Sequence, residues 1–189
     1  MIKAFLVLTL ILFQTSVLSA TLKNIKGTIT VNSVRAEEEK KVSPGDIISA
    51  IGKKSSVQIF FEDGSRSLLR NGQLILSEEK KQEKTVLSLV KGVLFTHKSK
   101  SPARLDIKTK YASMGVRGTK FYIDQSDKET YLCVCEGKVE ISNDKKKEEV
   151  DKNEDVHVSE RSKIEATQAN ADMLSMAWDG FKEMGLVEK

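Results

Sequence analysis

The sequence predicts an all-β domain, a two-sheet β-sandwich of the jelly-roll type, followed by a C-terminal α-helix. Two observations support this prediction. Short runs in which apolar and polar residues alternate are separated by Gly, Asp, Asn and Lys-rich turns, and the spacing changes to a helical one near Ala166. A chain of 189 residues, 39% of them hydrophobic, is long enough for one domain with a real core.

Residues 1–20 predict a signal peptide. A basic start at Lys3 precedes the apolar run Ala4–Phe13, and the small residues Ser19 and Ala20 follow. The apolar run is shorter than the roughly twenty residues that a membrane span needs. We therefore expect a periplasmic or secreted protein, cleaved after Ser19 or Ala20 and without stable membrane insertion afterwards; the alternative is an uncleaved N-terminal anchor.

Residues 21–165 are expected to form the β domain. Apolar and polar residues alternate over Val57–Phe61, and Asp63-Gly64 supplies the tight turn of a hairpin that leads into Leu68. Alternation also marks Leu105–Thr109 and Tyr131–Ile141, so one face of each strand should be buried and the other solvated.

A loose internal repeat accompanies these strands. Lys26-Gly27, Lys91-Gly92 and Glu136-Gly137 each lead into an alternating segment. The period is too irregular for a solenoid array, and two explanations remain open: related units that open and close the domain, or strand and turn chemistry reused by chance.

Residues 166–189 are expected to form a C-terminal amphipathic helix that stops at Gly185. Its apolar residues lie on one helical stripe: Met173, Leu174, Ala177, Trp178, Phe181 and Met184. Either the stripe packs onto the sandwich, or its methionines and single tryptophan form a surface for a partner.

The segment Ala112–Ile123 contains Gly-Val-Arg-Gly-Thr-Lys-Phe, and this block resembles the signature of the FecR family. The flanking turns Pro44-Gly45-Asp46 and Asp63-Gly64-Ser65, and the strand that begins at Glu136, stand in the order such domains show. The resemblance covers Ile25–Val158. It implies an extracytoplasmic all-β domain, found in ferric-citrate sensing regulators, where it relays a receptor signal to an anti-sigma segment.

The anti-sigma function is not carried over, because no cytoplasmic segment precedes the block and no later transmembrane segment follows it in the sequence. The resemblance does not assign an iron-sensing role either. What it implies for this chain is the domain, its compartment and a role in protein contacts.

The candidate binding residues come from the signature block and from the helix. Gly115 and Gly118 are expected to supply unusual backbone conformations around Arg117, with Thr119 beside them. Arg117 either turns back to an internal carboxylate such as Asp63 or Asp46, or captures an anionic group of a ligand or partner. On the helix, the candidates are Trp178 and Phe181.

Metal and disulfide chemistry find little support in the sequence. Cys133 and Cys135 share the parity of buried residues, which favours free thiols over a strained bridge. A zinc site with His97 and His157 rests on residue types alone, so we expect neither a metal nor a cofactor.

Catalysis and nucleic-acid binding are not expected either. No hydrolase or metalloprotease motif is present in the sequence, which argues against an enzyme. The net charge is only +4, and basic runs along the chain alternate with acidic ones. Both features argue against nucleic-acid binding.

The sequence therefore predicts a non-enzymatic module that senses or binds an envelope protein. The alternative is a binding domain for cell-wall glycan or peptide ligands.

Overall fold

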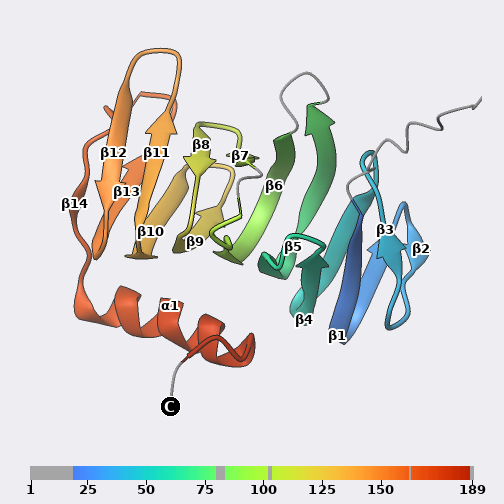
Figure 1. The fold of residues 1–189 in the computed structure, drawn as a ribbon. Helices are drawn as coiled ribbons and strands as arrows, with labels where there is room; N and C mark the ends of the chain where they lie inside the picture. The colour runs from blue at the N-terminus through green and yellow to red at the C-terminus, as the bar shows by residue number, and fades with distance from the viewer. Residues whose placement is uncertain (1–18, 80–83, 102–103, 162, 188–189) are drawn as a thin grey trace, which may run out of the picture.

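A computed structural model describes residues 19–79, 84–101, 104–161 and 163–187 (Figure 1). The predicted signal peptide therefore lies almost wholly outside the described residues. The elements are β1 (Ala20–Val31), β2 (Val34–Arg35), β3 (Lys41–Val42), β4 (Ile47–Phe61), β5 (Arg66–Glu79), β6 (Lys84–His97), β7 (Arg104–Lys108), β8 (Ser113–Val116), β9 (Lys120–Gln125), β10 (Thr130–Glu136), β11 (Lys138–Ser142), β12 (Lys147–Asp151), β13 (Glu154–Val158), β14 (Thr167–Gln168) and α1 (Ala171–Glu183).

The strands form two layers, and these layers are parts of one continuous 14-stranded sheet. One layer runs β12-β11-β8-β7 and continues through the first half of β6 into β5, β4, β1 and β2. The other runs β14-β13-β10-β9 and continues through the second half of β6. We call these layer A and layer B. The all-β prediction with a C-terminal helix is confirmed, and the two predicted sheets are joined into one that does not close.

The strands β1, β4, β5 and β6 pass from one layer to the other along a first crease. The strand register shifts there in each pair, between Ser49 and Ser56 for example. On β5 and β6 the backbones touch, because a Cβ on Gly72 would lie 2.9 Å from the Cα of Gly92. Glycine is needed at this contact because any side chain would collide with backbone.

A second crease lies at the other end of the strands. There β8 continues into β9 through Gly118, β10 into β11 through Gly137, and β12 into β13 through Asn153, all three with positive φ. This crease lies at the opposite end of the strands from the first. In the β9–β6 pair, Lys120 beside the second crease is the partner of His97, and Gln125 is the partner of Gly92 at the first crease. The glycines of the predicted repeat, Gly27 included, thus stand where the chain changes layer.

The main core lies between the two layers. Ile48 and Ala50 of β4 point into it from layer A, and Val57 and Ile59 of the same strand point into it from layer B. The parity changes because the crease between them absorbs extra residues. The core also joins side chains of β7, β8 and β11 to those of β9, β10 and β13, so both halves of the sheet share one hydrophobic interior.

Helix α1 covers the outer face of layer B (Figure 1). It starts later than predicted, because Thr167 and Gln168 pair with β13 and the Asn170 side chain caps the first turn by accepting from the Met173 amide at 2.8 Å. It ends as predicted at Gly185, which has a φ of 70°. Within the described ranges, no helix has the length and apolar character needed to span a membrane.

Candidate functional site

The signature block forms the turn between β8 and β9, on the second crease. Arg117 is exposed there, whereas Thr119 is only 1% exposed. Gly118 has a φ of 63°, which favours glycine. Two neighbours hold the turn: the Lys98 amide donates to the Thr119 carbonyl at 2.9 Å, and Gly137 lies so close that a Cβ on it would stand 2.8 Å from the Gly118 carbonyl oxygen. The turn is a fixed corner of the fold.

Gly115 does not have the role predicted for it. It lies in β8 in a regular antiparallel register with Asp106 and Glu140, and its φ is not positive. The nearest atom to an added Cβ would be a Glu140 carboxylate oxygen at 4.0 Å. The prediction of an unusual backbone conformation was wrong for Gly115, because this glycine belongs to the strand and the bend begins only after Val116.

Arg117 does not turn back to either carboxylate considered for it. Asp63 pairs with Lys98, and Asp46 accepts from the Asn32 side chain at 2.7 Å and the Ser43 amide at 2.8 Å. Among the described residues, Arg117 forms no hydrogen bond or ion pair. Its guanidinium group therefore faces solvent at the corner.

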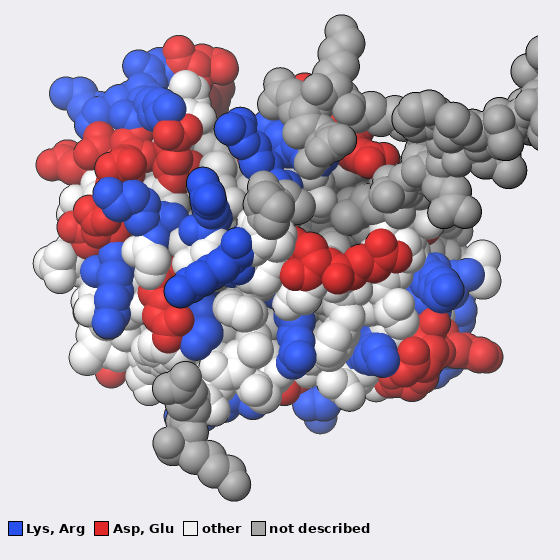
Figure 2. All heavy atoms as spheres, viewed as in Figure 1, with Lys and Arg blue, Asp and Glu red and all other residues white. Residues whose placement is uncertain are grey.

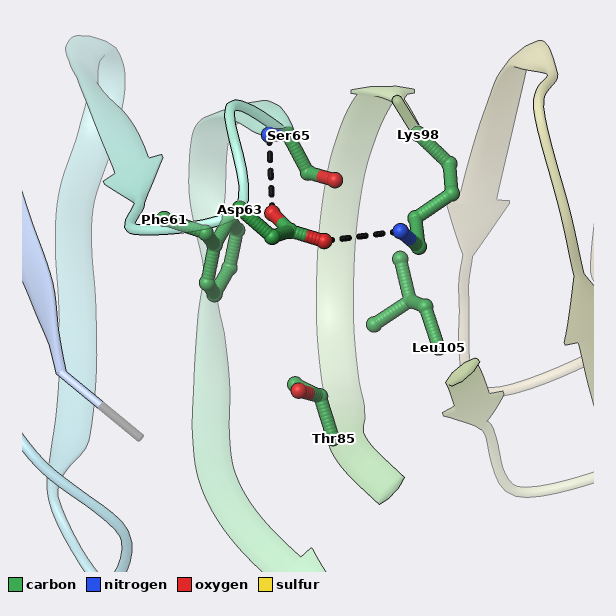
Figure 3. A pocket seen from close by; sticks show the side chains of 6 residues that line it. All are labelled: Phe61, Asp63, Ser65, Thr85, Lys98 and Leu105. Atoms are coloured by element: carbon green, nitrogen blue, oxygen red, sulfur yellow. Dashed lines mark hydrogen bonds and ion pairs between the residues drawn. The ribbon is translucent and has the colours of Figure 1, made fainter. Parts of the chain in front are cut away.

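Beside this corner, Lys98 is buried between the two layers (Figure 3). Its side chain is 2% exposed and its Nζ lies 2.7 Å from Oδ2 of Asp63. Burial opposes the charge on Asp63, but the hydrogen bonds from Lys98 and Ser65 outweigh it and lower the pKa of that carboxyl. The cavity these residues line with Phe61, Thr85 and Leu105 has a volume of about 10 Å³, room for one water at most.

The contact between Lys98 and Ser101 does not form a catalytic dyad. Nζ lies 3.2 Å from the Ser101 hydroxyl, but it also donates to Asp63 and to the Ser99 carbonyl. A lysine that acts as a general base must offer a free lone pair, whereas here Nζ donates to oxygen atoms of three neighbouring residues. The cluster is a buried ion pair that ties the β4–β5 turn to the end of β6.

The two helix candidates lie in different surroundings. Phe181 is 0% exposed and meets the ring of Phe95 edge-on at 6.0 Å, so it belongs to a second core under the helix and offers no free surface. Trp178 is half-buried, and Lys120 at the start of β9 lies over its ring at 5.4 Å. Lys120 is itself a residue of the signature block, so the structure brings Trp178 into contact with that block.

The helix is anchored at its C-terminal end by Glu183. Its carboxylate accepts from Lys26 of β1 at 2.9 Å and from Arg70 of β5, and its carbonyl accepts from Gln58 at 3.0 Å. Burial would raise the pKa of this carboxyl, but the two basic partners lower it. These contacts fix the helix across layer B.

A row of five half-buried side chains runs along layer B next to the second crease. We call it the cation–aromatic strip: Phe60, Arg66, His97, Lys120 and Trp178. The register pairs Phe60 with Arg66, Arg66 with His97 and His97 with Lys120. Arg66 lies over the Phe60 ring at 4.9 Å, as Lys120 does over Trp178.

The strip carries a local excess of positive charge. Burial lowers the pKa of His97, and the charges of Lys120 and Arg66 lower it further. One carboxylate, Glu136, pairs with Lys120 at 2.9 Å. The β11–β12 hairpin differs, because lysines and acids alternate there, as Figure 2 shows, and pair with each other, Lys147 with Glu140 at 2.6 Å for example.

Cys133 and Cys135 are free thiols, both 0% exposed, on the face of β10 beneath the helix. The hydrogen bond to Cys133 and burial raise the pKa of the Cys135 thiol, so it is a poor nucleophile. The free-thiol prediction is confirmed. In the part of the chain that the structure describes, no three His, Cys, Asp or Glu side chains are grouped so that they could hold a metal ion.

Residues 48–140 match the family model described as FecR protein. The chain carries a FecR-like domain. The match includes the signature block, four of the five strip residues and the second crease up to Gly137. The matched segment is shorter than the range Ile25–Val158 over which the sequence resembles the family. The strand β1 and the strands after β11 lie outside the match.

The FecR-like chain shares its fold with a crystal structure of a proposed anti-sigma factor from Parabacteroides distasonis ATCC 8503, at a TM-score of 0.60 and 18% identity. That match covers 71% of this chain and 65% of the other, so the chain spans about two thirds of the length of that protein. A second crystal structure with the same description gives a TM-score of 0.48, with 18% identity over 80% of this chain and 65% of that one. No curated protein matches the sequence.

Sequence reasoning missed Phe60, Arg66 and Lys120 as site residues, and it considered His97 only as a metal ligand. Their adjacency depends on strand register, which a single sequence does not give. One signal was present: a hairpin at Asp63-Gly64 brings Phe60 and Arg66 near each other, and the three-residue loop Glu62–Gly64 that the structure shows makes them direct partners.

Proposed function

We propose that this FecR-like chain is a non-enzymatic sensing and protein-interaction module of the cell envelope. The observation that carries the proposal is the family match over residues 48–140, with its signature turn held rigidly at an exposed corner. The solved structure that shares the fold is described as a proposed anti-sigma factor. A regulatory module needs such a fixed, partly charged surface and no reacting group.

The proposal places the mature protein in the periplasm or outside the cell. Residues 1–20 have the layout of a signal peptide, and FecR-like domains work outside the cytoplasm. Of the two expected cleavage positions we favour the one after Ser19, because Ala20 is 1% exposed and pairs with Val42 and Phe61 as the first residue of β1. N-terminal sequencing of the protein from fractionated cells tests both points; a cytoplasmic chain that keeps Met1 would refute them.

The interaction itself is tested by site-specific crosslinking in intact cells. A photoreactive residue replaces Arg117 at the exposed corner, and a control carries it at Lys145 in the β11–β12 turn, which is also exposed. We expect one envelope protein to be captured from position 117 and none from position 145. Capture of no protein, together with co-purification of wall fragments, would instead favour the cell-wall alternative.

Cell-wall glycan or peptide binding has weaker support from the geometry. A hollow of about 390 Å³ beside β2 is lined by Val31, Asn32, Val34, Arg35, Ala36, Glu37, Lys40 and Asp46. No lining residue carries the aromatic ring on which sugars usually stack. Protein binding is therefore the function we put forward.

A further inference from the structure

We propose that the cation–aromatic strip is the docking site for an extended acidic segment of the partner protein. This inference rests on the proposed interaction function and adds to it the surface used and the chemistry of the partner. The signature corner at Arg117 stands at one end of the same surface, because the turn leads directly into Lys120.

The first argument is that the strip holds a cation, Arg66, whose hydrogen-bonding capacity is unused. The guanidinium group of Arg66 contacts the face of Phe60, and among the described residues it makes no hydrogen bond or ion pair. Arginine offers five donors in a fork that matches a carboxylate. The Nδ1 atom of His97, next to Arg66, is buried and also lacks a partner in the described structure. The guanidinium group of Arg66 would therefore gain from an acidic ligand.

The second argument is charge complementarity. Lys120, Arg66 and Lys98 all act on His97 to disfavour its protonation, whereas Glu136 alone acts in the opposite sense. Like charges held together on a rigid sheet repel one another, and an anion placed over them relieves that repulsion. The paired lysines and acids of the β11–β12 hairpin offer no such gain.

The third argument is shape. The strip crosses β4, β5, β6 and β9, and adjacent strands are about 4.8 Å apart, so its length matches about five residues of an extended chain. Its width is one side chain, with the helix along one side and the second crease along the other. Phe60 and Trp178 provide apolar contacts towards the two ends. A row of this length and width fits a single peptide strand.

A broad anionic surface fits less well. The exposed Glu62 beside the β4–β5 turn and Glu136, whose side chain is 44% exposed, flank the strip and would repel a membrane that spread beyond it. A peptide can avoid these acids, because its carboxylates are spaced along a line.

The test uses Trp178, the single tryptophan of the chain, as a built-in reporter. Hepta-glutamate peptide is titrated into the full mature protein at low ionic strength while tryptophan fluorescence is recorded. We expect a saturable change that hepta-lysine does not produce and that added salt weakens. Arg66→Gln and Lys120→Gln should each bind about tenfold more weakly, the usual loss for a charged hydrogen bond.

Lys145→Gln is the matched control, since it removes the same charge from the exposed β11–β12 turn, whose strands do not belong to the strip, and it should bind as the unchanged protein does. Circular dichroism and thermal melting confirm that each variant is folded. The proposal would be overturned if Arg66→Gln bound the peptide as tightly as the unchanged protein does. It would also be overturned if Lys145→Gln lost as much affinity as the strip variants. So would tighter, strip-dependent binding of anionic lipid vesicles or of polygalacturonate than of the peptide.

Crosslinking in cells separates this inference from the proposed function. If the partner captured from position 117 is retained in an Arg66→Gln, Lys120→Gln double variant, the interaction function stands and the strip is not its docking site. If the protein with an intact strip and the photoreactive residue at position 117 captures no partner at all, the proposed interaction function itself fails.

Discussion

A matched pair of glycine substitutions tests the folded-sheet architecture directly. Gly72 and Gly115 both lie in strands, and neither has a positive φ. They differ in what a side chain would meet. A Cβ on Gly72 would stand 2.2 Å from the Lys91 carbonyl oxygen and 2.9 Å from the Cα of Gly92, both backbone atoms at the first crease. A Cβ on Gly115 would meet only a carboxylate oxygen at 4.0 Å.

The expected costs follow from these distances. At Gly72 the two strands must separate by about an ångström, and forced overpacking of this kind costs about 3 kcal/mol. For a chain of this size that lowers the melting temperature by roughly 6–12 °C. Gly115→Ala restricts the unfolded chain without a clash, so its stability should be unchanged or about 0.5 kcal/mol higher.

The assay is urea unfolding of both variants, followed by circular dichroism and fitted to a linear dependence on denaturant. A loss at Gly72 of less than about 1 kcal/mol relative to Gly115 would refute the reasoning, because sheets that do not touch at the crease would tolerate the methyl group.

Three further predictions follow from the helix and from the face it covers. Gly180→Ala should detach the helix and shift the tryptophan emission to the red, because a Cβ there would lie 2.2 Å from the Phe95 ring; an unshifted spectrum would show that the ring can move aside. The pKa of Glu183 is lowered in the fold, so the stability that its carboxylate contributes is present above the ordinary pKa of 4.5 and is lost as the pH falls below that value. Glu183→Gln should therefore lower the melting temperature near neutral pH and flatten its decline at acid pH. Parallel pH profiles of the two proteins would contradict this prediction. Cys133 and Cys135 should react with Ellman's reagent only after unfolding, and stoichiometric reaction of the native protein would mean that the helix does not cover them.

Local patterns predicted the elements better than their arrangement. The Asp63-Gly64 turn was confirmed: the Phe61 amide donates to the Ser65 carbonyl at 3.0 Å across the three-residue loop Glu62–Gly64, and Gly64 takes the positive φ of 81° that such a loop requires. A short loop of this kind is set by its own backbone preferences. The helix was also found, since its stripe packs as a unit on layer B. The length of β4–β6 was not predicted, because Gly52, Gly72 and Gly92 suggest ends of strands whereas each strand bends there and continues.

The candidate site shows the same limit. Arg117 and Trp178 were identified from the signature block and the helical stripe, but what lies between them depends on the pairing of β5, β6 and β9. Arg66 is ordinary in the sequence and becomes informative only once His97 and Lys120 are known to follow it across the sheet.

The crease also has a consequence for how the molecule comes apart. Because β1, β4, β5 and β6 each contribute hydrogen bonds to both layers, neither layer can lose its strands without breaking the other. Amide protons at the centre of β5 should therefore exchange with solvent at one common, global free energy on both sides of Gly72, instead of in two separate steps. A module built this way has no half-open state, so whatever binds one layer stabilises the whole domain.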